Sequence, residues 1–419
     1  MKSSTDQGKS ERLLFISCVP PRAQGIGIEQ RAWRNLQTVA RHQAPDLVLA
    51  LTSAQFKVLP ELHEVKAVCR SVHVVHLRSM TQTPSHRSSL ALIGQRLVRF
   101  GQPDLVASLD ELQAVVKAIG GIRFERVFCF RLRCFEVWRQ LQKLGWEHQR
   151  LLVDFDDIES LAQRRARMLA ASKLGFVMRV CSWIEERKTT RIEVSALQSA
   201  EVFVCSSEDR NRLLERVPYA RVHVLPNSYP LLPQLAPSPS FGTLRILFIG
   251  TLSYAPNIDG AQFFCEQVLP LVQQGSAQPV RVAIVGRNPT PNVLVLHKPP
   301  EIDVVGEVAS IESAYMHADL VVVPIRHGGG TRIKILEALA LGRPVVTTTL
   351  GCEGLNRRND VEVLVADSAA EFARACLRLA RDPTLAKALV LRGREALQSH
   401  FQDTAVQSHL HSLLFVSSS

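Results

Sequence analysis

Three consecutive glycines, Gly328–Gly330, are followed by Thr331, Arg332, Lys334 and Glu337 in the stretch GGGTRIKILEALALGRPVV. Glycine lets a backbone approach a ligand closely, and the start of a helix offers free N–H groups and a partial positive charge. We expect Thr331 to cap this helix, with the cations of Arg332 and Lys334 in its first turn. Since Arg supplies a fork of donors and Lys a point charge, the pattern predicts a phosphate site.

Glu337 lies three residues after Lys334, so both side chains are expected on one face of the helix, side by side. A carboxylate at a phosphate site should avoid the phosphate, and a hydroxyl of a ribose or sugar is its natural partner. The alternative is a capped amphipathic helix after a flexible loop, in which Lys334 and Glu337 form an ion pair of purely structural purpose.

This stretch resembles the nucleotide-sugar motif of the retaining group 1 glycosyltransferases, which have the GT-B fold, and in particular their bacterial exopolysaccharide subgroup. The resemblance runs from Arg245 to Arg381 through RILFIGTLSYAPNIDGAQFF (245–264), VAIVGRNP (282–289), VVGEV (304–308), ADLVVVPI (318–325) and GRPVVTTTLGCEGL (342–355). It implies an α/β protein of two Rossmann-like domains facing each other across a cleft. It also implies a nucleotide-sugar donor, most simply a UDP- or GDP-sugar, retention of configuration, and no metal or other cofactor.

The expected site residues lie on loops that follow strands, where open α/β sheets bind their ligands. For each loop an ordinary turn is the alternative. Two departures from the family stand out: Gly329 occupies a position where many relatives carry Glu, and the loop GTLSYAPNIDG lacks the usual Arg and Lys. Arg332 and Lys334 are therefore expected to carry most of the charge that binds phosphate. The expected catalytic residues are Lys334, Glu337 and Arg332, and the expected donor-binding residues are Gly250, Thr251, Gly286, Arg287, Gly306, Glu307, Val308, Gly328, Gly329, Gly330 and Thr331.

The first half of the chain is expected to bind the acceptor, a saccharide or lipid-linked saccharide. Gly25 and Gly27 follow the first predicted strand, and Arg131 follows another, so all three are expected on the acceptor side. Turn glycines and a surface arginine are the alternatives. Asp157, in LLVDFDDIES, is expected to cap the next helix rather than to bind metal.

The 419 residues suit two domains, and 46% apolar with 21% charged residues is typical of a globular protein. No apolar run is long enough to span a membrane. The nine cysteines are scattered and form no Cys-x-x-Cys pair, which favours free thiols in a reducing cytoplasm.

The net charge of +11 arises in the first half, because residues 1–240 hold 34 Lys and Arg against 23 Asp and Glu, and the remainder holds 16 of each. Such an excess suits the inner face of the cell membrane or a lipid pyrophosphate. No nucleic-acid-binding motif accompanies it, so we expect no nucleic-acid partner. Residues 164–188 mix basic and large apolar side chains; either a core-packed helix or an interfacial helix fits them.

Apolar runs alternate with helical stretches throughout, which is typical of parallel α/β sheets. Domains are expected at 1–235 and 236–399, joined by a Pro- and Ser-rich linker at 229–243, with a tail at 400–419 that returns to the first domain. Strands are expected at 13–18, 47–51, 72–77, 127–130, 151–155, 202–205, 222–225, 245–250, 281–285, 302–305, 319–323, 344–348 and 362–365. Helices are expected at 28–41, 88–99, 108–119, 135–144, 159–196, 207–215, 369–381 and 384–399.

A glycosyltransferase that acts in exopolysaccharide or cell-surface glycan synthesis is the function this pattern favours. A nucleotide-sugar epimerase on the same fold, or a member that only binds nucleotide sugars, are the alternatives. The sequence does not identify the nucleobase, the sugar or the acceptor.

Overall fold

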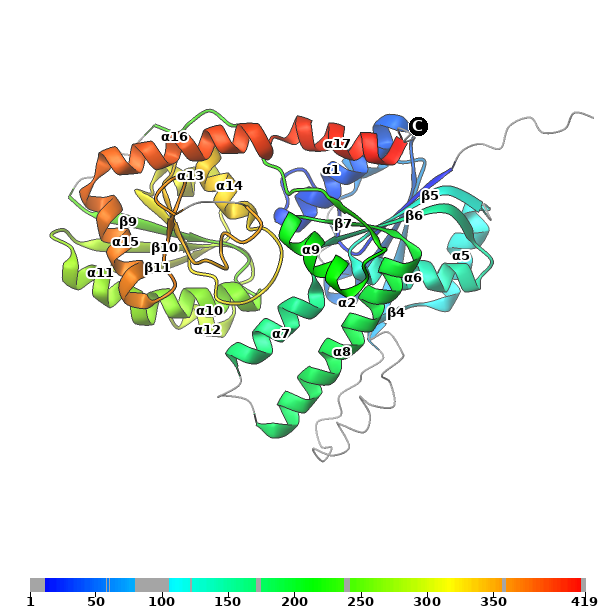
Figure 1. The fold of residues 1–419 in the computed structure, drawn as a ribbon, viewed down its shortest axis with the longest axis horizontal. Coiled ribbons are helices and arrows are strands. Elements are labelled where there is room, and N and C mark those ends of the chain that lie inside the picture. The colour runs from blue at the N-terminus through cyan, green and yellow to red at the C-terminus, as the bar shows by residue number, and fades with distance from the viewer. Residues whose placement is uncertain are drawn as a thin grey trace, which may run out of the picture. The chain divides into compact units, whose positions relative to one another are not determined.

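The computed structural model describes residues 12–57, 59, 61–79, 105–120, 123–170, 175–236, 242–355 and 359–415; the helix expected at 88–99 lies outside them. The chain forms two compact units, each built around one sheet (Figure 1). Unit 1 comprises Met1–Leu225 with Gln407–Ser419, and unit 2 comprises Pro226–Val406. The second unit thus begins at Pro226, where our expectation had placed the boundary after residue 235.

The sheet of unit 1 has the strand order β4-β3-β2-β1-β5-β6-β7-β8. Its central strands are apolar on both faces, as parallel strands covered by helices must be, and all five residues of β1 are buried. Every described pair is parallel except β3 with β4. The strands are β1 Leu13–Ser17, β2 Asp46–Thr52, β3 Ser71–Ser79, β4 Leu105–Ala107, β5 Arg123–Phe130, β6 Glu147–Asp156, β7 Glu201–Val204 and β8 Arg221–Val224.

The helices of unit 1 correct three details of the sequence analysis. The single helix expected at 159–196 is two helices, α7 and α8, and α2 and α3 were not expected. Asp157 does not cap α7, whose N-cap residue is Ile158 without a side-chain cap. The helices are α1 Gly27–His42, α2 Ser53–Lys57, α3 His63–Val68, α5 Leu109–Ile119, α6 Leu132–Lys143, α7 Glu159–Leu169, α8 Phe176–Ser199, α9 Ser207–Arg216 and α17 Asp403–Phe415, which belongs to unit 1 from Gln407 onward.

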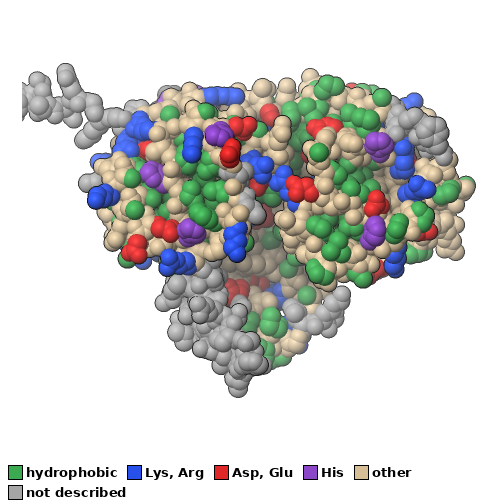
Figure 2. All heavy atoms as spheres, turned by 180° about the vertical axis from the view of Figure 1, so that it is seen from behind, with side chains coloured by type: hydrophobic (Ala, Val, Ile, Leu, Met, Phe, Trp, Pro, Cys, Tyr) green, Lys and Arg blue, Asp and Glu red, His purple; other side chains and the backbone are tan. Residues whose placement is uncertain are grey.

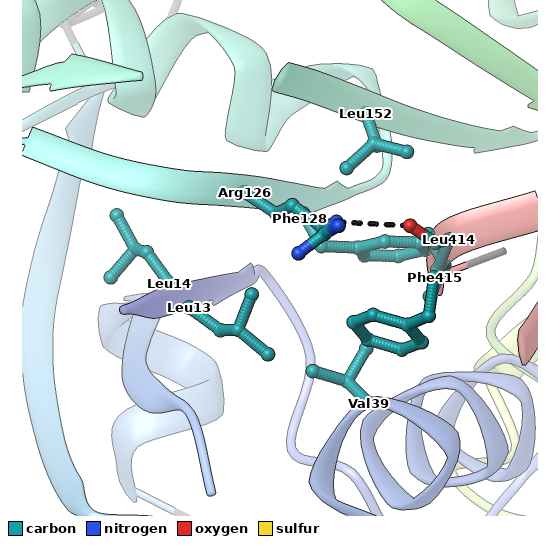
Figure 3. A pocket seen from close by; sticks show the side chains of 8 residues that line it. All are labelled: Leu13, Leu14, Val39, Arg126, Phe128, Leu152, Leu414 and Phe415. Atoms are coloured by element: carbon teal, nitrogen blue, oxygen red, sulfur yellow. Dashed lines mark hydrogen bonds between the residues drawn. The ribbon is translucent and has the colours of Figure 1, made fainter. Parts of the chain in front are cut away.

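The last helix, α17, packs on unit 1 at the amino ends of its central strands (Figure 3). Arg126 Nε and Arg150 Nη1 both donate to the carbonyl of Leu414, at 2.9 and 2.8 Å. Arg126 also lies 5.0 Å from the ring centroid of Phe415, and the two line a small pocket together with Leu13. Two cations therefore hold the negative end of the α17 helix dipole.

The sheet of unit 2 has the order β11-β10-β9-β12-β13-β14, and all described pairs are parallel. Buried apolar side chains cover both of its faces. The strands are β9 Leu244–Ile249, β10 Val280–Val285, β11 Ile302–Gly306, β12 Leu320–Val323, β13 Val345–Thr347 and β14 Leu364–Val365. The helices are α10 Ala255–Phe263, the π-helix Phe264–Val268, α11 Leu269–Gly275, α12 Pro291–Leu294, α13 Ile311–Met316, α14 Ile333–Ala340, α15 Ala369–Arg381 and α16 Pro383–His400.

Candidate functional site

The carboxyl edge of the unit 2 sheet brings three of the expected glycines together. Gly250 follows β9, Gly286 follows β10 and Gly306 ends β11, and these three strands are neighbours. The amide of Gly250 donates to the carbonyl of Val285 at 3.0 Å, and that of Gly286 to the carbonyl of Gly306 at 2.7 Å. A Cβ on Gly286 would lie 1.7 Å from the carbonyl oxygen of Gly250. Only glycine allows this close approach, so the three loops form one continuous backbone surface.

Lys334, on α14, extends to this edge beside Gly250. Its ammonium donates to Oδ1 of Asn257 at 2.8 Å and lies 5.3 Å from the ring centroid of Phe248. A Cβ on Gly250 would lie 2.6 Å from Nζ of Lys334, so the glycine leaves room for the cation. Desolvation by burial, and then repulsion by Arg332, lower the pKa of Lys334 to about 7.

Asn257 was not expected from the sequence, although it lies in the block SYAPN. It is the third residue of α10, its side chain is buried, and its Nδ2 donates to the carbonyl of Thr251 at 2.8 Å. It therefore ties the loop after β9 to the ammonium of Lys334. The Pro that precedes it at the start of α10 was the available signal, since Pro favours the first turn of a helix.

Arg332 has hydrogen-bonding capacity that the described chain does not use. Its side chain is buried, and Nη1 donates to the carbonyl of Gly329, while Nε and Nη2 have no hydrogen-bond partner. A Cβ on Gly328 would lie 3.1 Å from Nη2, and Gly328 has a φ of 108°. Because a buried donor without a partner is costly, these two nitrogens suit an anionic ligand.

The expected capping role of Thr331 is wrong. The N-cap residue of α14 is Arg332, and no side chain caps the helix. Instead, the hydroxyl of Thr331 accepts a hydrogen bond from Nδ2 of Asn227 at 2.7 Å. The N–H groups at the start of α14 therefore lack a side-chain cap, which is the state of a helix start that receives a ligand anion.

Glu337 faces two tyrosines rather than Lys334. Its Oε1 accepts from the hydroxyl of Tyr229 at 3.2 Å and its Oε2 from that of Tyr315 at 2.7 Å. Burial raises the pKa of Glu337, against the opposing effect of the tyrosine hydroxyls and of Lys334. Within the described part of the chain, Lys334 and Glu337 form no ion pair. The expectation that their charged ends lie side by side is thus wrong, because each charged end has its own partners.

The other cations of this edge are paired. Arg287 Nε lies 2.8 Å from Oε1 of Glu307, so two expected donor-binding residues contact each other. Arg326 forms a two-pronged contact with Asp259, at 3.0 and 2.6 Å. Val308, two residues after the end of β11, is partly buried against the core.

The expected acceptor-side residues lie in unit 1. A Cβ on Gly25 would lie 2.3 Å from Oε2 of Glu29, and Gly27 is the first residue of α1. Arg131 precedes α6 with a φ of 78° and binds Oδ2 of Asp156 at 2.7 Å and Oε1 of Glu159 at 3.3 Å. The charge of Arg131 is therefore matched by carboxylates of its own unit.

Among the described residues, no group of three or more His, Cys, Asp or Glu side chains is placed to hold a metal ion. No helix in this part of the chain is both long and apolar enough to cross a membrane.

Unit 1 has a sheet that is parallel except at β4, and unit 2 has a parallel sheet with glycines and the cations of Arg332 and Lys334 at its carboxyl edge. Residues 243–382 match the family model of group 1 glycosyl transferases. Sucrose-phosphate synthase from Thermosynechococcus elongatus is similar in structure over 96% of this chain and 98% of its own, with a TM-score of 0.68 and 16% identity. HepE from Anabaena, in complex with UDP-glucose, is similar over 96% of this chain and 99% of its own, with a TM-score of 0.60 and 14% identity.

A third similar structure is WaaG, a glycosyltransferase involved in lipopolysaccharide biosynthesis, which matches over 97% of this chain and 100% of its own, with a TM-score of 0.60 and 12% identity. No curated protein sequence matches the chain. The chain has the GT-B fold and carries a group 1 glycosyl transferase domain, which confirms the expected fold class.

Proposed function

We propose that this protein transfers a sugar from a nucleotide-sugar donor to a saccharide or lipid-linked saccharide, with retention of configuration. The observation that carries the proposal is the pair of cations at the carboxyl edge of the unit 2 sheet. Neither Lys334 nor Arg332 forms an ion pair with a carboxylate of the described residues, and two nitrogens of Arg332 have no partner. An anionic group such as a diphosphate would match both.

The proposed chemistry follows from the charge that develops on the leaving group. When the glycosidic bond breaks, the nucleoside diphosphate gains negative charge, and preorganised cations and helix N–H groups stabilise it. Lys334 and Arg332 supply that charge in this proposal, with the uncapped start of α14. The hydroxyls of the ribose or sugar are assigned to Glu337. No protein nucleophile and no metal ion are part of the proposed reaction.

UDP-sugars are the donors to test first, because HepE has been solved with UDP-glucose, and GDP-sugars come next. The proposed setting is exopolysaccharide or cell-surface glycan synthesis at the inner face of the cell membrane. The excess positive charge of residues 1–240 supports a peripheral contact with that surface.

The test is incubation of the full chain with UDP-, GDP- and ADP-sugars, with and without a saccharide acceptor and with and without EDTA. Release of free nucleotide and a product of retained configuration, both unaffected by EDTA, are expected. Conversion of the donor's own sugar without acceptor would identify an epimerase instead. Tight binding without turnover of any donor would identify a binding protein and would contradict the proposed reaction.

A further inference from the structure

Helices α7 and α8 form an antiparallel pair that extends away from the sheet of unit 1 (Figure 1). Two contacts fix their direction: Ser160 Oγ donates to Glu193 at 2.5 Å, and Arg167 Nη2 donates to Glu186 at 2.6 Å. Arg167, the later residue of α7, thus contacts Glu186, the earlier residue of α8, so the two helices run antiparallel. Residues near the end of α7 and the start of α8 are consequently farthest from the Ser160–Glu193 contact.

One face of α8 carries alternating aromatic and basic side chains, Phe176, Arg179, Trp183 and Arg187, which we name the α8 stripe. All four are exposed, Phe176 by 71% and Trp183 by 45%. Their spacing of three, four and four residues places them along one side of a helix. The guanidinium of Arg187 lies 5.2 Å from the ring centroid of Trp183, a cation–π contact at the surface.

The α8 stripe is part of a larger exposed apolar region at the far end of the α7–α8 pair, which we call the hairpin. Met168 and Leu169 at the end of α7 and Met178 on α8 are also exposed, and Figure 2 shows hydrophobic side chains at the surface of this part of unit 1. The opposite face of α8 is packed: Cys181 and Ile184 are buried. The helix therefore has one core face and one exposed face. The core face fits the core-packed interpretation of residues 164–188, and the exposed face is the one that an interfacial helix would use.

Three of the four carboxylates of the α7–α8 pair, Glu159, Glu186 and Glu193, pair with cations outside the α8 stripe. Residues 159–199 hold eight Lys and Arg against four Asp and Glu. Of the four carboxylates, Glu186 pairs with Arg167 and Glu193 with Arg216, at 2.6 and 2.8 Å. Glu159 lies 3.3 Å from Arg131. The exposed surface of the stripe is thus cationic and aromatic, which is complementary to an anionic surface with an apolar interior.

We propose that the α8 stripe docks unit 1 on an anionic lipid bilayer. Phe176 and Trp183 enter the boundary between headgroups and acyl chains, where aromatic rings are favoured. Arg179 and Arg187 bind the lipid phosphates, while their stems cover apolar surface. This inference deepens the peripheral contact proposed above by naming its residues and its lipid class, and it does not depend on the transfer reaction.

The test is co-sedimentation of the full chain with phosphatidylcholine vesicles, with and without about a third of phosphatidylglycerol. We expect binding to the anionic vesicles only, weakened by salt, and about tenfold weaker or more after Arg179→Gln with Arg187→Gln, because each surface cation contributes separately. Phe176→Ala with Trp183→Ala should weaken binding similarly. The matched control is Leu391→Ala with Arg392→Gln, an exposed apolar–basic pair on α16, which should bind like the parent chain.

Fluorescence gives a second readout, because Trp183 is the exposed tryptophan and Trp33, Trp138 and Trp146 are buried. The emission of Trp183 should shift to shorter wavelength when the protein binds anionic vesicles, and acrylamide should quench it less. Equal binding to neutral vesicles, or unchanged binding of the stripe variants, would overturn the inference. So would a dimer in light scattering that the stripe variants dissociate while no vesicle binds. Binding of UDP in solution, measured in parallel, separates failure here from failure of the proposed reaction.

Discussion

The ammonium of Lys334 donates to Oδ1 of Asn257 at 2.8 Å, whereas the carboxylate of Glu337, three residues later on α14, accepts from Tyr229 and Tyr315. A structural ion pair would have joined the two charged side chains. Because they are separate, the ammonium of Lys334 lies beside Gly250 and has the neutral side chain of Asn257 as its partner. This geometry favours a site that receives negative charge from a ligand.

Asn257→Asp should weaken donor binding. The new carboxylate would pair with Lys334 and repel a diphosphate, so the Kd for UDP should rise about tenfold or more. Isothermal titration calorimetry measures it. Asn292→Asp, on the exposed surface of α12, makes the same change of charge away from Lys334 and should leave the Kd unchanged. An equal effect of both variants would show that net charge, not the Lys334 contact, controls binding.

Binding of UDP should be linked to proton uptake above pH 7. Free Lys334 has its pKa lowered to about 7, and a bound diphosphate should favour the charged ammonium, so binding at about pH 8 should take up close to one proton. Calorimetry in two buffers of different ionisation enthalpy measures this number. Lys334→Arg, which stays charged, should abolish the uptake; a persistent uptake in that variant would assign it to another group.

The same pKa predicts a pH dependence of stability. An unfolded lysine titrates near pH 10.4, so between about pH 7 and pH 10 unfolding takes up a proton that the folded chain lacks. The free energy of unfolding should therefore gain a positive slope with pH in this window. Lys334→Met should remove that slope, and chemical denaturation at several pH values would show it. Identical slopes in both proteins would contradict the lowered pKa.

Gly250→Ala should impair the activity of the folded protein as well as its stability. Its Cβ would lie 2.6 Å from Nζ of Lys334 and 2.7 Å from Nδ2 of Asn257, so both side-chain ends must move. Gly250 also has a φ of 154°, which other residues rarely adopt, so we expect a lowered Tm. In the folded fraction we expect at least about a tenfold loss in kcat/KM, roughly 1.4 kcal/mol. Gly145→Ala, where the added Cβ meets open space at a φ of 94°, controls for the backbone. Full activity of Gly250→Ala would contradict this placement of Lys334.

Arg131→Met should mainly destabilise unit 1. It removes the nearest cation from Asp156, which keeps Arg31 at 3.7 Å, and the cation from Glu159. For these partly buried pairs we expect a cost of about 1.5–3 kcal/mol of unfolding free energy. Burial raises the pKa of Asp156, but Arg131 and Arg31 lower it by more, so the net effect is a lowered pKa. The stabilisation is therefore present at neutral pH and is lost as the pH falls through that pKa. Denaturation curves at neutral and acid pH measure it. Unchanged stability with lost transfer activity would favour the acceptor-side role instead.

The alternation of apolar runs and helical stretches was sufficient to predict most of the fold. Buried strands such as β1 and β9 are continuous apolar segments, so their positions follow from the sequence. Short elements were harder to predict from the sequence. Strand β4 has only three residues and pairs antiparallel, and so short an apolar segment cannot be told from a turn. The break between α7 and α8 was missed because the helical pattern continues across it.

The candidate site was predicted less completely, because its side chains find partners far along the chain. The glycines at strand ends are readable, since parallel strands share one edge. Asn257 is 77 residues from Lys334, and Tyr229 is 108 residues from Glu337, so no local sequence pattern predicts either contact. Thr331 was misassigned for the same reason, since Asn227, 104 residues away, binds its hydroxyl.

The most direct test of the proposed function is the kcat and thermal stability of Lys334→Met with the preferred nucleotide sugar. Loss of a cation that stabilises the leaving group should lower kcat about a hundredfold or more, roughly 3–4 kcal/mol. The Tm should stay the same or rise, because a partly buried charge is replaced by an apolar side chain of similar length. A lowered Tm together with normal kcat in the folded fraction would show that Lys334 serves the fold, and would contradict the account.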